Sequence, residues 1–303
     1  MYVMQPSKSN RTKEDAMSAT QVAEIELCRF ARPYDWNMID ATVHHEGGAI
    51  LESLFCANEV GRFNHEIDDY LASHEDAGRP RSGSSAYDKF LGYRTVRLHG
   101  LIEKFESAAG WIGRRELVDW AGRAVEPVAT SILLNTAELI QIGPGEPEQY
   151  LHRDSDSWPM APLGGHPLVV NVIMALDPFT LENGATHVTP GSWRWDRGRK
   201  PSPDEISRAI MEAGDALIFR GDIVHGGGAN TTDRPRRAVS ISYCAGWLRP
   251  VENSILNVSK ACAKTLPKHV QGLLGYAAYD GTRDRGGLVG LFENGDPGTF
   301  LED

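Results

Sequence analysis

The stretch Gln149-Tyr150-Leu151-His152-Arg153-Asp154 places a histidine and an aspartate two residues apart. On an extended strand, side chains two residues apart point to the same face, so His152 and Asp154 can reach one metal ion together. A third ligand is available where His225 ends an apolar run, in Ile223-Val224-His225-Gly226-Gly227-Gly228. A lone His-x-Asp pair is a weak signal, because a strand histidine is more often a core residue than a ligand. We therefore take the three residues together as a candidate metal site.

The chain around this stretch indicates a β-rich core. Between Ser131 and about Trp247, short apolar or alternating runs are separated by turn signals such as Gly143-Pro144-Gly145. This pattern is typical of antiparallel barrels and jelly rolls. The strands that it predicts are residues 132–142, 168–175, 186–189, 216–219, 223–225 and 238–247. The predicted fold class is therefore mainly β with flanking helices.

The segments outside this core have mixed or helical patterns. Before the core we expect three helices, over residues 36–46, from an Asn58 cap through Leu71, and over residues 115–130. We also expect strands over residues 49–55 and 93–101 and a mobile loop over residues 73–85. After the core, residues 261–274 have partly helical character. The predicted organisation is a flexible N-terminus (1–18) and a single domain over 19–303, made of a mixed N-terminal part (19–130), a jelly-roll core (131–248) and a C-terminal tail (249–303).

Composition and charge exclude several classes of function. The chain has 303 residues, a formal net charge of -10 and a pI near 5.5. This acidity argues against general binding to nucleic acid or to anionic membranes. No apolar run approaches the length of a membrane-spanning helix. The four cysteines, Cys28, Cys56, Cys244 and Cys262, are scattered without a CxxC pair, as expected for reduced thiols. These observations predict a cytoplasmic protein whose partner is a small molecule.

Further polar residues near the candidate ligands suit a carboxylate-bearing cosubstrate. Arg236 and Arg237 begin the last predicted strand, and a guanidinium can bind a carboxylate bidentately while staying charged. Thr186 and Gln149 carry a hydroxyl and an amide that can hydrogen-bond to carboxylate oxygens. The alternative is that the arginines belong to a solvated turn and that Thr186 and Gln149 are ordinary turn or strand residues. Two histidines and one carboxylate also form the facial triad of non-haem Fe(II) oxygenases.

Taken together, these motifs resemble a known family. Gln-x-x-His-x-Asp, then Asn-Gly-Ala-Thr and Pro-Gly-Ser, then His-Gly-x-Gly-x-Asn followed by Arg-Arg are similar to the phytanoyl-CoA dioxygenase family of Fe(II)/2-oxoglutarate oxygenases. The resemblance runs over residues 41–297 and is most specific over 133–247. Residues 171–177 and the tail are similar to the branch that acts in bacterial and fungal natural-product pathways.

The resemblance implies a double-stranded β-helix, that is, a cupin-like jelly roll. It also implies Fe(II) as cofactor, held by His152, Asp154 and His225, with 2-oxoglutarate and O₂ as cosubstrates. Arg236 would hold the distal carboxylate of 2-oxoglutarate, with Gln149 and Thr186 assisting. Arg237 is the alternative residue for this role, and a homodimer is seen in similar enzymes.

One residue departs from the family pattern. The family usually has Pro-Gly-Ser-His, whereas Trp193 stands at the histidine position here. The aspartate ligand is present, which argues against the related halogenases. The candidate substrate contacts near the motif are Tyr150, Trp158, Met160 and Trp193, and residues 73–93 are a candidate lid.

The function that this resemblance implies is oxidation of an apolar small molecule in natural-product biosynthesis. Hydroxylation is the basic outcome, and desaturation, rearrangement and endoperoxidation are its variants. A second reading is an acyl-CoA hydroxylase, for which a basic cluster could receive the anionic substrate: Arg194, Arg197, Arg199 and Lys200. A third is a Zn- or Ni-dependent enzyme of cupin fold, which would not need Arg236, and a fourth is a non-catalytic binding protein.

Overall fold

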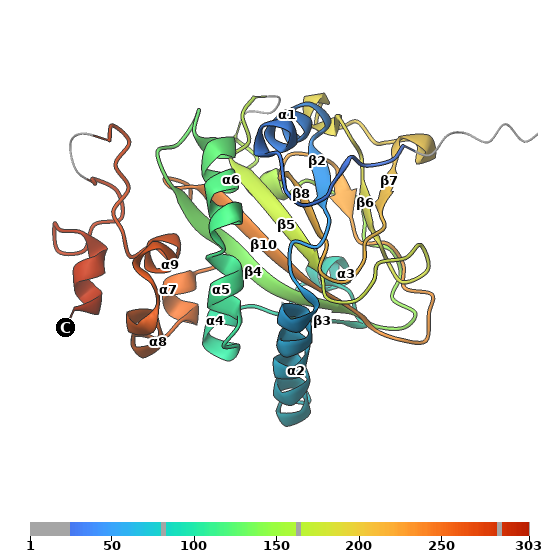
Figure 1. Cartoon of the computed structure of the whole chain (residues 1–303), viewed down its shortest axis with the longest axis horizontal. Coiled ribbons are helices and arrows are strands. Elements are labelled where there is room, and N and C mark those ends of the chain that lie inside the picture. The colour runs from blue at the N-terminus through green and yellow to red at the C-terminus, as the bar shows by residue number, and fades with distance from the viewer. Residues whose placement is uncertain (1–24, 80–82, 162–164, 284–286, 303) are drawn as a thin grey trace, which may run out of the picture.

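The computed structural model describes residues 25–79, 83–161, 165–283 and 287–302 (Figure 1). The predicted flexible N-terminus, residues 1–18, lies outside this range. Within the described part of the chain, none of the helices combines the length and the apolar character needed to cross a membrane. The four cysteines are free thiols, and Cys28 and Cys56 are exposed.

A seven-stranded sheet forms the centre of the structure. Its strands, in order across the sheet, are β1 (Arg29–Phe30), β2 (Gly48–Leu51), β8 (Ala216–Arg220), β5 (Val169–Ala175), β10 (Arg236–Ala245), β4 (Ile132–Ile142) and β3 (Thr95–Leu98). All neighbours are antiparallel except β1 and β2. The long pair of β4 and β10 is irregular between Ser242 and Tyr243, where the register shifts.

A second, three-stranded sheet packs over part of the first. It consists of β7 (Ser207–Ala209), β6 (Thr186–Val188) and β9 (His225–Gly226), in that order. Val188 and Ala209 of the small sheet share one buried apolar cluster with Ile173, Leu217 and Phe219 of the large sheet. The architecture is thus rich in sheet with flanking helices, as predicted, and is consistent with a cupin-like core.

Most of the helices cover the other face of the large sheet. The helices are α1 (Trp36–Glu46), α2 (Ala57–Ser73), α3 (Ser85–Leu91), α4 (Leu101–Lys104), α5 (Ala108–Ile112), α6 (Arg115–Val125), α7 (Ser254–Asn257), α8 (Lys260–Thr265) and α9 (Lys268–Leu273), and α3 is the exception, because its residues line a cavity on the opposite face. Figure 1 shows α4, α5 and α6 running across β4, β10 and β5. Leu117 and Trp120 of α6 are fully buried in one cluster with Leu139 of β4 and Ile241 of β10.

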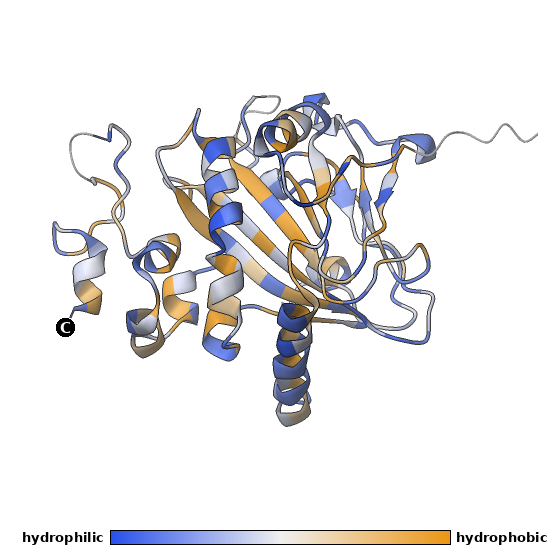
Figure 2. Cartoon of the chain, viewed as in Figure 1, coloured by the Kyte–Doolittle hydropathy of each residue, from blue (hydrophilic) through white to orange (hydrophobic). Residues whose placement is uncertain are grey.

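The alternation of side chains along β4 and β10 separates this core from the opposite face of the sheet. Val239 and Ile241 pack towards the helices, whereas Ser240 and Ser242 line a cavity on the other side. The same strand is therefore coloured both apolar and polar in Figure 2. The helix-covered face thus carries the larger apolar core, and the part of the other face that lines the cavity carries polar groups.

The predicted elements agree with the structure where apolar periodicity was strong. The bounds of α1 and β4 are those predicted. The helix predicted over 115–130 ends at Val125, two residues before Pro127, which has no backbone N–H to continue the helical hydrogen bonds. The helical tail breaks into α8 and α9 at Pro267, where the preceding Leu266 is extended, as expected for a residue before proline. The N-cap of α2 is Cys56 rather than Asn58, and its backbone N–H donates to Glu59 at 2.8 Å.

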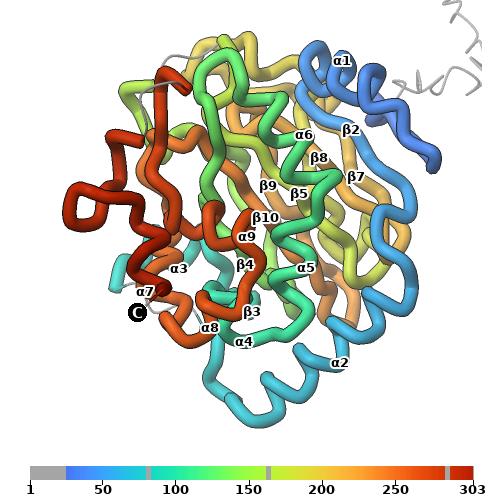
Figure 3. The backbone as a smooth tube through the Cα atoms, turned by 60° about the vertical axis from the view of Figure 1, so that its left-hand side comes forward, coloured from blue at the N-terminus to red at the C-terminus, as the bar shows by residue number. Residues whose placement is uncertain are grey.

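The C-terminal segment is joined to the core through a buried carboxylate. Glu252 accepts hydrogen bonds from the backbone N–H groups of Gly100 (2.8 Å) and Ala137 (2.9 Å) and from the Asn257 side chain (2.8 Å). Figure 3 shows α7, α8 and α9 beside α4 and β4. Burial alone would raise the pKa of Glu252, but the nearby His99 ring and hydrogen bonds from Ala137 and Asn257 outweigh it and lower the pKa to about 2.

We predict that Glu252→Gln lowers the free energy of unfolding by about 2 kcal/mol at pH 7, because a neutral amide accepts these hydrogen bonds more weakly than an ionised carboxylate does. The folded-state pKa lies below the unfolded one, so this stabilisation is present above pH ~5 and is lost as the pH falls towards 2. Urea unfolding of both proteins at several pH values measures the difference. A difference that stays constant from pH 7 to pH 3 would contradict the assignment.

Candidate metal centre and its cavity

Three side chains converge in the structure as the sequence predicted. His152 Nε2 lies 3.4 Å from Asp154 Oδ1, and His225 Nε2 lies 3.7 Å from Asp154 Oδ2. One ligand atom from each residue falls within 4.8 Å of the others. Among the residues that the structure describes, this is the one group of three or more His, Cys, Asp or Glu side chains arranged to hold a metal ion.

The backbone brings these residues together through a single bridge. The N–H of each of His152 and His225 donates to the carbonyl oxygen of the other, both at 2.9 Å. The backbone is extended through Arg153, as predicted, but at Asp154 the chain turns into a short 3₁₀ helix, η1 (Asp154–Ser157), instead of continuing as a strand. Glycine at position 226 permits the close approach, since a Cβ there would lie 3.2 Å from the Gln149 carbonyl oxygen.

Hydrogen bonds fix the orientation of all three side chains. The Nδ1 atom of His152 lies 3.2 Å from the Tyr150 carbonyl oxygen, and that of His225 lies 3.2 Å from the Ile223 carbonyl oxygen. A carbonyl oxygen only accepts, so each Nδ1 carries the hydrogen and each Nε2 keeps its lone pair for a metal. Asp154 Oδ2 accepts a hydrogen bond from Asn171 Nδ2 at 2.7 Å.

The protonation states also suit metal binding near neutral pH. Burial lowers the pKa of His225 to about 4, so its imidazole is neutral. Burial raises the pKa of Asp154, but His225, His152 and the Asn171 amide outweigh this effect and lower the pKa to about 2. Neutral imidazole nitrogen and ionised carboxylate are the forms that ligate a metal ion.

A buried arginine lies in the same cavity. The Arg236 side chain donates to the carbonyl oxygen of Gly184 and lies 4.0 Å from the centre of the Phe179 ring. Burial lowers its pKa to about 9, and within the described chain it has no ion pair. Arg237, in contrast, pairs with Asp68 at 2.7 Å and donates to Gln141 at 2.6 Å. Of these two neighbouring arginines, Arg236 is therefore the one without a carboxylate partner in the described chain.

The cavity holds about 440 Å³ and unites the residues predicted for metal and cosubstrate. Its lining includes Gln149, His152, Asp154, Thr186, His225 and Arg236. Gln149 Oε1 accepts from the Gly227 N–H at 3.1 Å, and its Nε2 donates to the Phe90 carbonyl oxygen at 3.1 Å. Residues far apart in sequence therefore surround one space of a size typical for small-molecule sites.

Helix α3 covers part of this cavity, although the sequence analysis did not predict a helix there. The Phe90 ring stands edge-on to His152, with 4.8 Å between ring centres, and Tyr87 and Leu91 also line the cavity. Arg97 Nε donates to the Leu91 carbonyl oxygen at 2.8 Å. Ser84 caps the helix through the N–H of Tyr87, a signal present in the sequence. Residues 80–82 of the predicted lid lie outside the described part of the chain.

The predicted substrate contacts have separate locations. Tyr150 lines the cavity, whereas Trp158, Met160 and Trp193 are not among its lining residues. Met160 is 94% exposed, and Trp158 packs against an apolar cluster that includes Val169 of β5. Trp193 is buried between the guanidinium groups of Arg194 and Arg220, at 4.1 and 4.0 Å from its ring centre. The residue that departs from the family pattern thus packs in the core.

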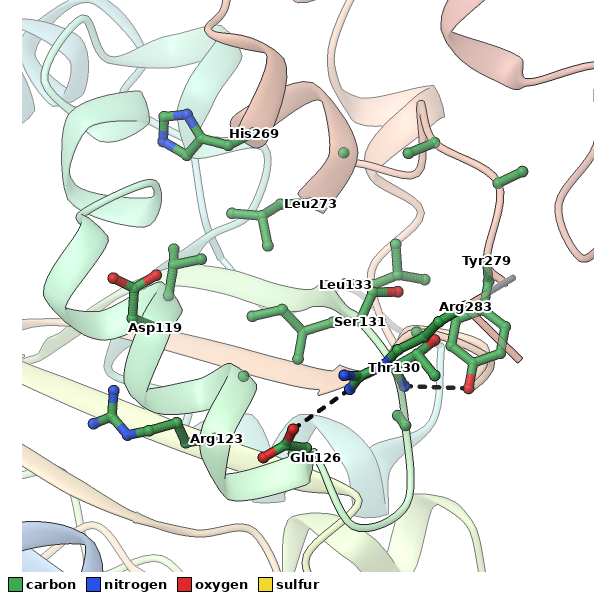
Figure 4. A pocket seen from close by; sticks show the side chains of 18 residues that line it. Asp119, Arg123, Glu126, Thr130, Ser131, Leu133, His269, Leu273, Tyr279 and Arg283 are labelled. Atoms are coloured by element: carbon green, nitrogen blue, oxygen red, sulfur yellow. Dashed lines mark hydrogen bonds and ion pairs between the residues drawn. The ribbon is translucent and has the colours of Figure 1, made fainter. Parts of the chain in front are cut away.

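A larger hollow of about 740 Å³ lies elsewhere, between α6 and the C-terminal segment (Figure 4). An ion pair between Glu126 and Arg283 spans it, with 3.6 Å between the nearest atoms. Tyr279 accepts a hydrogen bond from the Thr130 N–H at its rim. None of the candidate metal ligands lines this hollow, so the chemistry belongs to the smaller cavity.

Comparisons with known proteins agree with this picture. Residues 43–238 match the family model described as phytanoyl-CoA dioxygenase. A protein named dioxygenase swnH1, from Metarhizium robertsii, is 30% identical over 304 residues, which covers 92% of this chain and 93% of the relative. Among solved structures, the epimerase SnoN, described as a complex with Fe³⁺, alpha ketoglutarate and nogalamycin RO, superposes with a TM-score of 0.57 at 19% identity, covering 86% of this chain and 96% of SnoN. The carbocyclase SnoK, described as coming from nogalamycin biosynthesis, gives a TM-score of 0.57 at 18% identity, covering 72% and 88%.

We predict that Asn171→Leu weakens Fe(II) binding by roughly 10- to 100-fold, because Asp154 loses the hydrogen bond that orients it. Anaerobic calorimetric titration of the metal-free protein with Fe(II) measures the change. Asn58→Leu, at an exposed position on α2, is the matched control and should bind as the unmodified protein does. Equal affinities for the three proteins would show that Asn171 does not support the site.

Proposed function

The chain belongs to the phytanoyl-CoA dioxygenase family, and from that premise we propose that it is an Fe(II)- and 2-oxoglutarate-dependent dioxygenase that oxidises a small molecule. The observation that carries the proposal is one cavity shared by the two-histidine, one-carboxylate cluster and the unpaired Arg236. We also propose that the two packed sheets form a double-stranded β-helix, for which the family membership and the likeness to SnoN are the support.

The donor set fits iron and leaves room for cosubstrates. Two imidazole nitrogens and one carboxylate supply three ligands, so positions remain for a keto acid and O₂. These ligands alone would also accept Zn²⁺ or Ni²⁺, since both metals bind well to nitrogen and oxygen donors. The choice of an oxygenase therefore rests on Arg236 and on the family rather than on the triad alone.

Arg236 supports 2-oxoglutarate as the cosubstrate. A buried charge without a counter-ion is unfavourable, and a bound carboxylate would compensate it. The far carboxylate of 2-oxoglutarate is such a group, and Gln149 and Thr186 lie in the same lining to hydrogen-bond to it. We assign this role to Arg236 rather than Arg237, whose side chain already has Asp68 as its partner.

The chain's own residues contribute orientation and exclusion of water. When bound, Fe(II) with 2-oxoglutarate and O₂ supplies the oxidising power to remove hydrogen from a C–H bond. His152 and His225 are held by backbone carbonyls, so the ligand geometry is set before substrate binds. Phe90 and Phe219 place apolar rings against the two histidines and limit access of water from those sides.

We infer a natural product as substrate, with hydroxylation or one of its variants as the outcome; the likeness to enzymes described as acting in nogalamycin biosynthesis supports this inference. An acyl-CoA is less well supported, because the basic cluster is largely engaged. Arg197 pairs with Asp156, Arg199 pairs with Glu205, and Arg194 stacks on Trp193. A cytoplasmic location and a homodimer remain predictions from the sequence.

Anaerobic titration of Fe(II) into the metal-free protein with 2-oxoglutarate is expected to give the visible charge-transfer band of a chelated keto acid. His152→Ala should abolish the band because a metal ligand is removed. Arg236→Ala should weaken 2-oxoglutarate binding roughly 30-fold or more, since the carboxylate loses its buried counter-charge. Arg237→Ala removes the neighbouring guanidinium, which already has a partner, and should keep the affinity of the unmodified protein.

The outcome that would overturn the proposal is a folded protein that binds Fe(II) without developing the band. Retained affinity in Arg236→Ala together with loss in Arg237→Ala would move the carboxylate-binding role to the second arginine. Activity that requires Zn²⁺ or Ni²⁺ and is unaffected by Arg236→Ala would instead indicate a different metalloenzyme.

A further inference from the structure

The strand register places four side chains in one row across the floor of the cavity. Phe219, Asn171, Ser242 and Thr136 are direct partners across β8, β5, β10 and β4, and all four line the cavity. Asn171 donates to the metal-ligand candidate Asp154 at 2.7 Å. Because Ser242 is the register partner of Asn171, its hydroxyl lies in the row that supports the metal centre.

The cavity has two chemically different ends along β10. Arg236 and Ser242 are separated by an even number of positions, so they share the cavity face of the strand, roughly 20 Å apart at about 3.4 Å per residue. A cosubstrate carboxylate bound at Arg236 extends towards the metal from that end. The Ser242 end is left for the molecule that is oxidised.

At this end of the cavity, the hydroxyl hydrogen of Ser242 has no acceptor in the described chain. Its side chain is buried, and its Oγ accepts a hydrogen bond from Asn135 Nδ2 at 3.0 Å. Asn135 is itself fixed, because its Oδ1 accepts from the Val251 N–H at 2.9 Å. A serine hydroxyl can also donate one hydrogen bond, and no side-chain hydrogen bond in the described chain has the Ser242 hydroxyl as its donor. A buried donor without an acceptor is unfavourable, so this hydrogen is available for a bound molecule.

The charges around Ser242 are already paired with one another. Arg97 contacts Glu138 at 2.6 Å, and the His99 ring lies between Glu138 (3.4 Å) and Glu252 (3.7 Å). No carboxylate or guanidinium of this group is left for an ionic ligand. The remaining lining at this end includes apolar side chains, among them Val251.

We propose that Ser242 donates a hydrogen bond to a neutral oxygen of the substrate, a carbonyl or a hydroxyl, and so determines which carbon faces the metal. The proposal rests on the proposed function, because it assigns the free end of the cavity to the substrate. It refines the predicted apolar small molecule to an apolar body that carries an oxygen close to the oxidised carbon.

The test measures selective binding to the anaerobic protein loaded with Fe(II) and 2-oxoglutarate. The protein is dialysed against an equimolar mixture of decalin, decalol and decalone, which share one carbon skeleton, and bound compounds are quantified by mass spectrometry. Unmodified protein should enrich the ketone and the alcohol over the hydrocarbon. Ser242→Ala should reduce the ketone-to-hydrocarbon ratio about tenfold, and Ser242→Thr should retain the preference because it keeps a hydroxyl.

Ser207→Ala is the control, because Ser207 is also a buried strand serine but lies on β7 outside the cavity lining. Equal ratios in the unmodified protein and in Ser242→Ala would overturn the proposal, as would a lack of ketone enrichment in the unmodified protein. The charge-transfer band of the loaded protein is recorded first. Its absence would count against the proposed function, whereas a normal band with unselective binding would count against the role of Ser242 alone.

Discussion

The reciprocal backbone hydrogen bonds between His152 and His225 are the constraint on which the site depends. They join two segments that are far apart in sequence, and they do so at the residues whose side chains would bind the metal. With the backbones fixed, each ring needs only one further contact, the carbonyl oxygen two residues earlier, to direct its Nε2 towards Asp154. The metal geometry is therefore a property of the backbone as much as of the ligands.

Electrostatic balance explains why the two ends of the cavity differ. Asp154 is compensated by two histidines and Asn171, and Glu252 by backbone N–H groups and Asn257. The charge of Arg236 is not compensated in this way, since burial destabilises it and its hydrogen bonds go to backbone carbonyl oxygens. A fold that keeps such a group buried gains a strong preference for an anion at that position. The opposite end, where charges pair internally, favours a neutral ligand.

The residues that could be predicted from the sequence are those that belong to short, recognisable motifs. His152, Asp154, His225 and Arg236 could be named because their spacing and order are specific, and the structure places all four in one cavity. Asn171 and Ser242 could not be selected, because their importance comes from strand register, and an isolated asparagine or serine in an apolar strand carries no signal. Phe90 was missed because α3 is short and half-exposed, so its apolar pattern is weak. Trp193 was placed near the substrate on proximity in sequence, whereas packing between two arginines decides its position.

The alternation along β10 has a consequence for how this protein can diverge. Val239, Ile241 and Tyr243 hold the helices, and the intervening Ser240 and Ser242 face the cavity. Substitutions at the second set change the shape and polarity of the cavity and leave the buried apolar contacts intact. Stability and ligand preference are thus determined at alternating positions of one strand. Single substitutions at the cavity positions can alter which ligand is accepted without requiring compensating changes in the core.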